Sequence, residues 1–417
     1  MVDKKSAGAT LHPETLMMSH GYDPFLSEGA VKPPVFLTST FAFRTAEEGA
    51  NFFDALRAAD NSASGLIYSR FNHPNLQIAE ERLAVYEGGE TSAVFSSGMS
   101  AIATTLLALV QTGETILRSQ PLYGGTETLI TNVLAKQGIK TECFVDGLDE
   151  SSLRQAAKCA VQGGRVSVIF LETPSNPTNT LIDFELVSKI AGEIEEQQNH
   201  RPVIVCDNTL LGPIFQSPLE HGVDLVLYSL TKYIGGHSDL VAGACIGSKE
   251  LIDKVRAARS AFGTQLDPHS SWMIGRSLET VSLRMQRAND SAIEIAKFLD
   301  SHPKIAHLHH PLFAQHASYK TVFEKQCSGP GSTFSFDLVG GREKAFKFLN
   351  QLGIFKLAVS LGGTESLVCH PRSTTHSSVN PELLDQLEIS EALVRTSIGL
   401  EHPDDLIADL TQALASL

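Results

Sequence analysis

The sequence predicts an α/β protein in which a large, mostly parallel sheet is followed by a smaller α+β domain. Short β-branched runs alternate with helical segments up to about residue 270, and several of these runs end in polar residues. Strand and helix patterns are mixed beyond that point. The 417 residues are too many for one ordinary core. We therefore expect an N-terminal arm over 1–62, a large domain over 63–270 and a small domain over 271–417.

The N-terminal arm contains few periodic segments. Val31–Phe36 carries paired prolines, which keep this stretch extended. A segment of this length with little core of its own usually packs on another surface. We expect a mobile tail only over the first ten or so residues.

Tyr68 and Arg70 lie in the next polar stretch, Y-S-R-F-N-H-P-N. An arginine guanidinium is a planar donor that suits phosphate, and a tyrosine hydroxyl can add a hydrogen bond. An ordinary surface loop would have the same composition, so the motif does not establish a site by itself.

A phosphate site is predicted at the start of a long helix. An apolar strand pattern ends at Ser96, and Ser97, Gly98 and Met99 then open the helix. Free backbone N–H groups and the helix dipole would face an anion there, and a glycine lets the backbone approach closely. An ordinary capped helix would use Ser97 equally well.

Strand and helix patterns alternate through the middle of the chain. Thr115–Leu117 and Glu142–Val145 have strand composition and flank a helical segment, Thr126–Lys136. Tyr123 follows the first of these strands, and the two glycines after it give its loop room to approach other groups. A packed loop aromatic is the alternative for Tyr123.

Two prolines direct a polar side chain after the next strand. Val166–Glu172 has a buried-strand pattern and is followed by T-P-S-N-P. The prolines at 174 and 177 force a non-helical turn that directs Asn176. Asparagine is also common in turns for local reasons, which is the alternative. Asp183–Glu196 then has the pattern of an amphipathic helix.

Asp207 closes a buried, β-branched strand pattern over Val203–Thr209. A carboxylate at a strand end can pair with a protonated pyridine nitrogen. It could equally cap a helix or bind a metal ion.

Lys232 follows a second apolar run, Leu225–Leu227. Desolvation at the mouth of a strand lowers the pKa of a lysine and makes its neutral amine available for a Schiff base. The hydroxyls of Ser229 and Thr231 could bind a phosphate beside it. An ordinary exposed lysine is the alternative. A cofactor site is favoured because Asp207 ends a separate parallel-type strand one helix-sized segment earlier.

The last part of the chain carries one arginine of interest. Arg395 interrupts the strand pattern in Leu393–Glu401. A fork of donors projecting from a strand suits a substrate α-carboxylate, and a surface salt bridge is the alternative. The other elements expected here are helices at Lys249–Ala261, Pro268–His302, Lys344–Leu352 and Asp404–Leu414, and a strand at Phe334–Leu338.

Asp207, the run S-L-T-K ending at Lys232 and the following G-G-H-S-D resemble the enzymes of cysteine and methionine metabolism that depend on pyridoxal 5'-phosphate (PLP). This transsulfuration family includes cystathionine γ-synthase, cystathionine γ- and β-lyases, methionine γ-lyase and the O-acylhomoserine sulfhydrylases. The resemblance extends from about Lys32 to the C-terminus. It implies the type I aspartate aminotransferase fold, with a seven-stranded sheet in the large domain, and PLP as the cofactor.

The resemblance also implies a role for each candidate residue. Lys232 would carry PLP and act in catalysis, and Asp207 would face the ring nitrogen. Tyr123 would stack on the ring and assist proton transfer at the leaving group, and Asn176 would bond the ring hydroxyl. The phosphate would contact Ser97, Gly98, Met99, Ser229 and Thr231, and also Tyr68 and Arg70 of a neighbouring subunit. The substrate would contact Arg395, Ser360, Thr375 and Val359. Sites shared in this way imply a dimer at least, and the resemblance implies a homotetramer built as a dimer of dimers.

Three positions bear on the reaction. Methionine γ-lyases carry a cysteine where this chain has Gly125, and a Lys-Asp pair in the segment matching Arg259-Ser260. Cystathionine enzymes often carry a glutamate at Val359, where it attracts a distal ammonium. These differences favour a carbon–sulfur lyase of moderate breadth, acting on cystathionine, methionine or related thioethers. γ-Replacement on an O-acylhomoserine is the alternative.

Composition excludes other classes of function. The formal net charge of −14 argues against nucleic acid and anionic membranes as partners. The N-terminus lacks the apolar core of a signal peptide, and the six cysteines form no C-x-x-C, so we expect a cytoplasmic protein with reduced thiols. A metal hydrolase using His73, His237 and Asp207 is a distant alternative, but the spacing matches no standard zinc pattern and we expect no metal. A non-catalytic protein is the other distant alternative.

Overall fold

The computed structural model describes residues 11–57, 65–377 and 379–417. It contains a seven-stranded sheet in the order β1-β7-β6-β5-β4-β2-β3. Strands β3, β2, β4, β5 and β6 are parallel, whereas β7 is antiparallel to both β6 and β1. The predicted α/β class and the large, mostly parallel sheet are therefore confirmed. The strands are β1 Thr91–Phe95, β2 Thr115–Ser119, β3 Lys140–Phe144, β4 Val166–Glu172, β5 Val203–Asp207, β6 Leu225–Tyr228 and β7 Gly243–Gly247.

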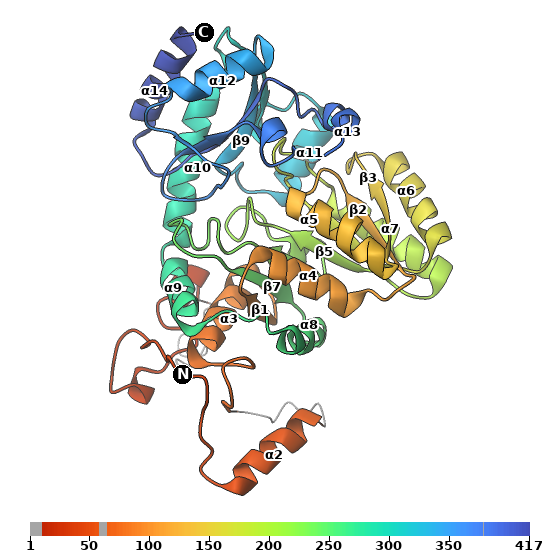
Figure 1. Cartoon of the computed structure of the whole chain (residues 1–417), viewed down its shortest axis with the longest axis vertical. Helices are drawn as coiled ribbons and strands as arrows, with labels where there is room; N and C mark the ends of the chain where they lie inside the picture. The colour runs from red at the N-terminus through yellow and green to blue at the C-terminus, as the bar shows by residue number, and fades with distance from the viewer. Residues whose placement is uncertain (1–10, 58–64, 378) are drawn as a thin grey trace.

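Helices cover both faces of this sheet (Figure 1). One face packs α3 (Pro74–Glu87), α6 (Glu150–Gly163) and α7 (Phe184–Gln198) in one hydrophobic cluster. The other face packs α4 (Gly98–Leu109) and α8 (Lys249–Phe262) in a second cluster. Both faces are therefore buried, which explains the near-continuous apolar strands in the sequence.

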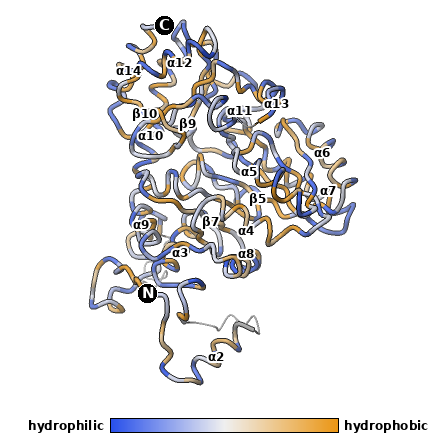
Figure 2. The backbone as a smooth tube through the Cα atoms, viewed as in Figure 1, coloured by the Kyte–Doolittle hydropathy of each residue, from blue (hydrophilic) through white to orange (hydrophobic). Residues whose placement is uncertain are grey.

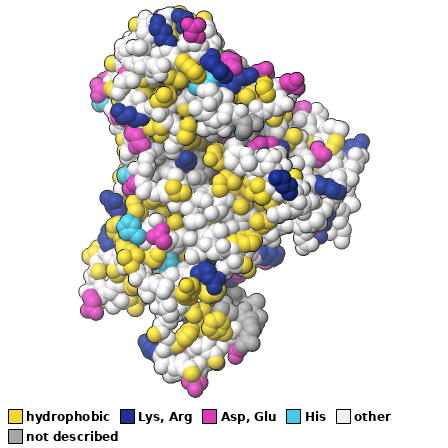
Figure 3. All heavy atoms as spheres, in the orientation of Figure 1, with side chains coloured by type: hydrophobic (Ala, Val, Ile, Leu, Met, Phe, Trp, Pro, Cys, Tyr) yellow, Lys and Arg dark blue, Asp and Glu magenta, His cyan; other side chains and the backbone are white. Residues whose placement is uncertain are grey.

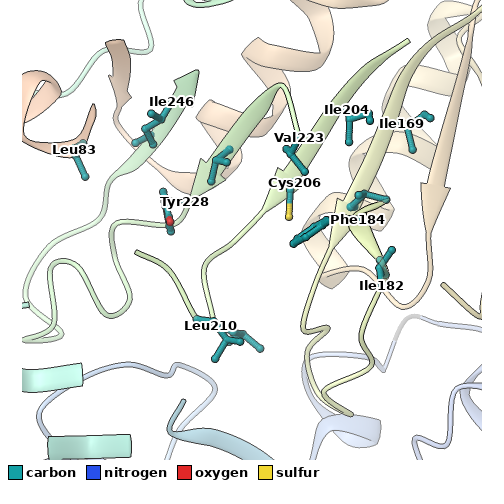
Figure 4. Packing of buried hydrophobic residues seen from close by; sticks show 14 of the residues in the cluster. Leu83, Ile169, Ile182, Phe184, Ile204, Cys206, Leu210, Val223, Tyr228 and Ile246 are labelled. Atoms are coloured by element: carbon teal, nitrogen blue, oxygen red, sulfur yellow. The ribbon is translucent and has the colours of Figure 1, made fainter. Parts of the chain in front are cut away.

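Successive side chains along the strands belong alternately to the two hydrophobic clusters. Ile169, Ile204 and Cys206 belong to the first cluster and lie on the same side as Phe184 (Figure 4). Their neighbours in the strands belong to the second cluster, since successive side chains of a strand point to opposite faces. Along α6 and α7, hydrophobic and hydrophilic residues alternate as expected for helices with one buried face (Figure 2).

A smaller five-stranded sheet follows, in the order β10-β11-β12-β9-β8. Its core packs α10 (Val281–Asp300), α12 (Gly341–Gln351) and α14 (Pro403–Ala415). The strands are β8 Ile305–His309, β9 Thr333–Leu338, β10 Lys356–Leu357, β11 Leu367–Cys369 and β12 Leu393–Ser397. The remaining segments are η5 Pro311–Phe313, α11 Ala317–Gln326, η6 Pro371–Ser373 and α13 Pro381–Gln386.

Some elements differ from those expected. The single helix predicted over 268–302 is two helices, α9 (Pro268–Leu278) and α10, because Thr280 has a non-helical backbone between them. The helix expected over 126–136 is α5 (Gly124–Thr128) followed by the π-helical η2 (Leu129–Leu134) and the short η3 (Ala135–Gln137). Between β5 and β6 there is only a 3₁₀ turn, η4 (Pro218–His221).

The N-terminal arm projects from the large domain (Figure 1). It contains α1 (Pro13–Leu16), η1 (Pro24–Leu26) and, against the expectation of few periodic segments, the twelve-residue α2 (Ala46–Arg57). The predicted mobile tail and the boundary at residue 62 lie outside the described residues. No helix within the described ranges has the length and apolar character needed to cross a bilayer.

Candidate active site

A cavity of about 260 Å³ lies at the carboxyl ends of β4, β5 and β6. The N-terminus of α4 and strand β12 of the small sheet complete its walls. It brings together most of the predicted site residues: Ser97, Gly98, Met99, Tyr123, Asn176, Asp207, Ser229, Thr231, Lys232, Val359, Thr375 and Arg395. This position follows the general rule that ligands bind α/β sheets at the carboxyl ends of their strands.

Lys232 lies in the tight turn after β6. Its backbone N–H donates to the carbonyl of Ser229 at 3.1 Å, and its Nζ donates to Ser360 Oγ at 3.0 Å. Burial, and next the positive charge of Arg395, lower the pKa of the Lys232 amine. A larger fraction of the amine is therefore neutral, as a nucleophile or a base must be.

Asp207 and Glu172 end neighbouring parallel strands and lie opposite each other in register. Asp207 Oδ1 accepts hydrogen bonds from the hydroxyl and the backbone N–H of Thr209, at 2.6 and 3.1 Å. Burial raises the pKa of both carboxyls, and the charge of Asp207 raises that of Glu172 further. A protonated pyridine nitrogen beside Asp207 would supply positive charge to this buried pair, so the site fits a PLP ring.

The N-terminus of α4 forms the opposite wall. Ser97 caps the helix by accepting the backbone N–H of Ser100 at 2.9 Å. A Cβ at Gly98 would lie 3.0 Å from the Cβ of Ser229, and one at Gly243 would lie 2.2 Å from the carbonyl oxygen of Ser97. Only glycines allow this close approach, which leaves room for a phosphate against the helix N-terminus.

Thr231 is engaged with the chain that returns from the site. Its hydroxyl donates to the carbonyl of Ala242 at 3.2 Å and accepts the backbone N–H of Ala242 at 3.0 Å. Thr231 therefore anchors the segment before β7 as well as lining the cavity.

Arg395 reaches the cavity from the small sheet and is only 2% exposed. Its Nη1 donates to Asn176 Oδ1 at 3.2 Å, and its Nη2 donates to the carbonyls of Val359 and Ser360 at 3.1 and 2.9 Å. These acceptors are all neutral. Nε is buried and has no partner among the residues that the structure describes. A guanidinium held in this way suits a carboxylate ligand.

Tyr68 and Arg70 do not line this cavity. Arg70 Nη1 donates to the carbonyl of Ser260 at 2.6 Å, and its guanidinium lies 4.4 Å from the Phe71 ring centroid. Tyr68 is 41% exposed. The pair therefore lies apart from the site of its own chain.

The distant metal-hydrolase alternative receives no support. Both ring nitrogens of His73 are used, one accepting the Leu76 N–H and the other bonded to the carbonyl of Leu266. His237 bonds the carbonyl of Gly235. Neither histidine is among the described residues that surround Asp207 in the cavity.

Two residues of the site and one residue beside it were missed by sequence reasoning. Glu172 accepts the backbone N–H groups of Tyr123 at 2.6 Å and of Asn176 at 3.1 Å, and so holds both loops. Thr209 connects Asp207 to the backbone N–H of Ser229. His376, 1% exposed, lies beside Thr375, and burial lowers its pKa to about 4. Only Glu172 had a visible signal, a carboxylate at the end of a buried strand.

A lysine with a lowered pKa, a desolvated carboxylate pair and a helix N-terminus in one α/β cavity define a PLP-binding enzyme. The model of the Cys/Met metabolism PLP-dependent enzyme family matches residues 14–415. The chain belongs to this family, and its cofactor is PLP.

Individual relatives agree with this assignment. The chain is 40% identical to an L-methionine gamma-lyase of Pseudomonas putida over 96% of each chain. It is 34% identical to a cystathionine gamma-lyase of Bacillus subtilis over 97% of this chain and 99% of the relative. A crystal structure of cystathionine gamma synthase from Xanthomonas oryzae pv. oryzae, in complex with aminoacrylate and cysteine, matches with a TM-score of 0.87 and 32% identity, over 98% of this chain and all of that one.

Proposed function

We propose that this protein is a carbon–sulfur lyase that splits thioether amino acids into a thiol, ammonia and a keto acid. The observation that carries the proposal is the convergence of Lys232, Asp207 and Arg395 in one cavity. An amine, an acid and a carboxylate receptor are the groups that such a reaction needs from the protein. The names of the relatives, several of which are lyases, support the same class of reaction.

The positions of the side chains around the cavity support the proposed cofactor contacts. Lys232 would hold PLP, Asp207 would face the ring nitrogen and Tyr123 the ring face. Asn176 uses its Oδ1 for Arg395, which leaves its Nδ2 to donate to the ring hydroxyl. The phosphate would lie among Ser97, Gly98, Met99, Ser229 and Thr231, at the end of α4. When bound, PLP supplies an electron-withdrawing ring that stabilises negative charge at the substrate Cα.

The side chains then divide the remaining work. Arg395 binds the substrate carboxylate and orients the Cα hydrogen toward Lys232. The Lys232 amine, with its lowered pKa, accepts that proton at Nζ, and the nearby Ser360 hydroxyl keeps it directed into the cavity. Tyr123, 43% exposed at the cavity wall, is placed to give a proton to the leaving sulfur.

The substrate tail would be neutral. Val359 lines the cavity and is 59% exposed, whereas a carboxylate here would attract a distal ammonium by about 1–4 kcal/mol. Arg259, in the segment where methionine γ-lyases carry a Lys-Asp pair, is 2% exposed and pairs with Glu80. The apolar Val359 favours methionine-like thioethers over cystathionine, whereas the missing Lys-Asp pair argues against an enzyme dedicated to methionine. We therefore propose a lyase of moderate breadth, with Thr375 as a secondary contact.

γ-Replacement on an O-acylhomoserine is the second candidate, because the matched cystathionine gamma synthase shares the whole fold. Incubation with methionine, cystathionine, homocysteine and O-acylhomoserine plus cysteine separates the two. We expect keto acid and thiol from the thioethers. Abundant thioether formation from the O-acyl substrate, without keto acid, would contradict the lyase proposal.

We also propose a cytoplasmic homotetramer with sites shared between subunits, and the domain boundaries given by the sequence. Exposed hydrophobic side chains on the arm, including Phe25, Leu26, Val31 and Leu37, suit a subunit interface. Figure 3 shows such side chains gathered over the projecting segment that carries α2. Light scattering tests the assembly: a combined Phe25→Asp and Leu26→Asp change should reduce the particle mass, whereas a monomeric wild type would contradict the proposal.

A further inference from the structure

A group of possible metal ligands lies on the small domain, apart from the cavity of Lys232. Ligand atoms of His307, His309 and Glu388 all lie within 4.8 Å of one another. His307 and His309 are two residues apart on β8, so both imidazoles project from one face of this edge strand. Their ring centroids are 4.4 Å apart, with the rings nearly perpendicular. Glu388 comes from the loop between α13 and β12.

His309 is held as a metal-bound imidazole usually is. Its Nε2 lies 2.8 Å from Asp337 Oδ2, and the side chain is almost fully buried. A carboxylate only accepts, so Nε2 carries the proton and Nδ1 keeps a lone pair for a ligand. Most metal-binding histidines donate their second ring N–H to a carboxylate in this way. This contact is independent of the cluster itself.

The loop that carries Glu388 is fixed to the same carboxylate. Ser390 Oγ donates to Asp337 Oδ1, so Asp337 connects the histidine strand to the loop. His307 and Glu388 are exposed, whereas His309 is buried. The exposed side chains of His307 and Glu388 can rotate toward a cation without breaking the core.

A cavity of about 440 Å³ gives solvent access to this cluster. Its walls include all three ligand residues and the loop after β2 at Gln120 and Pro121. Two zinc-bound nitrogens, each about 2.0–2.1 Å from the metal, are separated by about 3.3 Å in a tetrahedral site. Ligand atoms within 4.8 Å therefore need only small side-chain rotations.

We propose that His307, His309 and Glu388 form a binding site for a divalent late transition metal, represented by zinc, with Asp337 as its positioning residue. Two imidazoles and one carboxylate suit zinc, whereas magnesium and calcium prefer oxygen ligands alone. The fourth position faces the cavity and is left to water. The metal would join β8 to the loop before β12, and the proposal does not depend on the reaction proposed above.

Zinc titration of the PLP-loaded, chelator-treated enzyme tests the site. We expect one zinc per chain, a raised melting temperature and an X-ray absorption spectrum with imidazole ligands. His307→Ala and Glu388→Gln should each weaken binding at least about tenfold, and Asp337→Asn by about 10–100-fold. His269→Ala, an exposed histidine on α9, is the matched control and should bind as the wild type does.

The visible absorbance of bound PLP shows whether each variant is folded. Absence of zinc binding in the wild type would overturn the proposal. So would equal affinity and stoichiometry in the wild type and in both ligand variants, because the zinc would then lie elsewhere, for example on cysteines.

Discussion

The pKa values of the titratable residues in the site are determined by burial and by a few close partners. Burial, and next the nearby guanidinium of Arg395, lower the pKa of the Lys232 amine. The pKa values of Asp207 and Glu172 are raised instead, because the two carboxyls share one desolvated space. Negative charge on this carboxyl pair is therefore unfavourable, and a cationic ring nitrogen beside Asp207 would stabilise it.

Glu172→Gln tests whether this carboxyl positions the two loops. The amide keeps one acceptor for the backbone N–H groups of Tyr123 and Asn176 and places a donor against the other, at a cost of about 1–3 kcal/mol. We expect kcat/KM to fall by about tenfold or more. Exposed Glu196→Gln is the control, and wild-type kinetics for Glu172→Gln would contradict this role.

Glu87→Gln tests a pH dependence of stability. Burial raises the pKa of Glu87 from 4.5 to about 8, while the hydrogen bond from Tyr228 opposes this shift. At a pH between 4.5 and about 8, Glu87 is ionised in the unfolded chain but keeps its proton in the folded chain. The stability that is present below pH 4.5 is therefore lost as the pH rises toward about 8.

We expect the urea midpoint of Glu87→Gln to fall less than that of the wild type between about pH 5 and about pH 8. Glu324→Gln, at an exposed position, should follow the wild type. If the urea midpoints of Glu87→Gln and the wild type depend on pH in the same way, the raised pKa of Glu87 is refuted.

Polar residues at the end of a buried strand, just after one or within one could be predicted from the sequence, and the cavity does contain Asp207, Lys232 and Arg395. Thr209 and His376 could not be predicted. Their importance comes from contacts across strands and between domains, which have no local pattern. The ligand cluster on β8 was missed for the same reason, since Glu388 is distant in sequence from the histidines.

At the scale of elements, α4 closely approaches the turn after β6 at the proposed phosphate position. Gly98→Ala would place a Cβ 3.0 Å from the Cβ of Ser229 and 3.1 Å from its hydroxyl. Overpacking of about 1–3 kcal/mol should weaken PLP binding by about 5–150-fold. Equilibrium dialysis or fluorescence titration of the cofactor measures this loss.

Gly192→Ala on α7 is the matched control. A Cβ there has no described atom within 4 Å, so the change should leave PLP binding intact and stabilise the helix by about 0.5–1 kcal/mol. Equal cofactor affinity in the two variants would show that the close approach at Gly98 is not needed.

Most elements of the large domain could be predicted because both faces of the sheet are buried, and burial imposes apolar strands between amphipathic helices. The break between α9 and α10 carries neither proline nor glycine, so the sequence gives no stop signal there. Helix α2 was also missed. Its polar composition and Gly49 weaken the helical pattern, and its exposed Phe53 is consistent with support from another subunit.

At the scale of the whole molecule, the separation of Arg70 from the cavity predicts sites built across an interface. Arg70→Ala and Lys232→Ala homomers should each be inactive, because every site lacks one group. Mixed dimers contain one doubly altered site and one intact site, so subunit exchange should restore about a quarter of wild-type activity. Mixtures that stay inactive after proven exchange would place both residues in the site of the same chain.

The account depends most on the bond between Lys232 and the cofactor. Borohydride reduction of the PLP-loaded enzyme, followed by peptide mapping, locates this attachment directly. We predict a single phosphopyridoxyl group on Lys232, absent from Lys232→Ala and retained in the exposed-lysine control Lys189→Ala. Label on another lysine, or an unlabelled but fully active enzyme, would contradict the account.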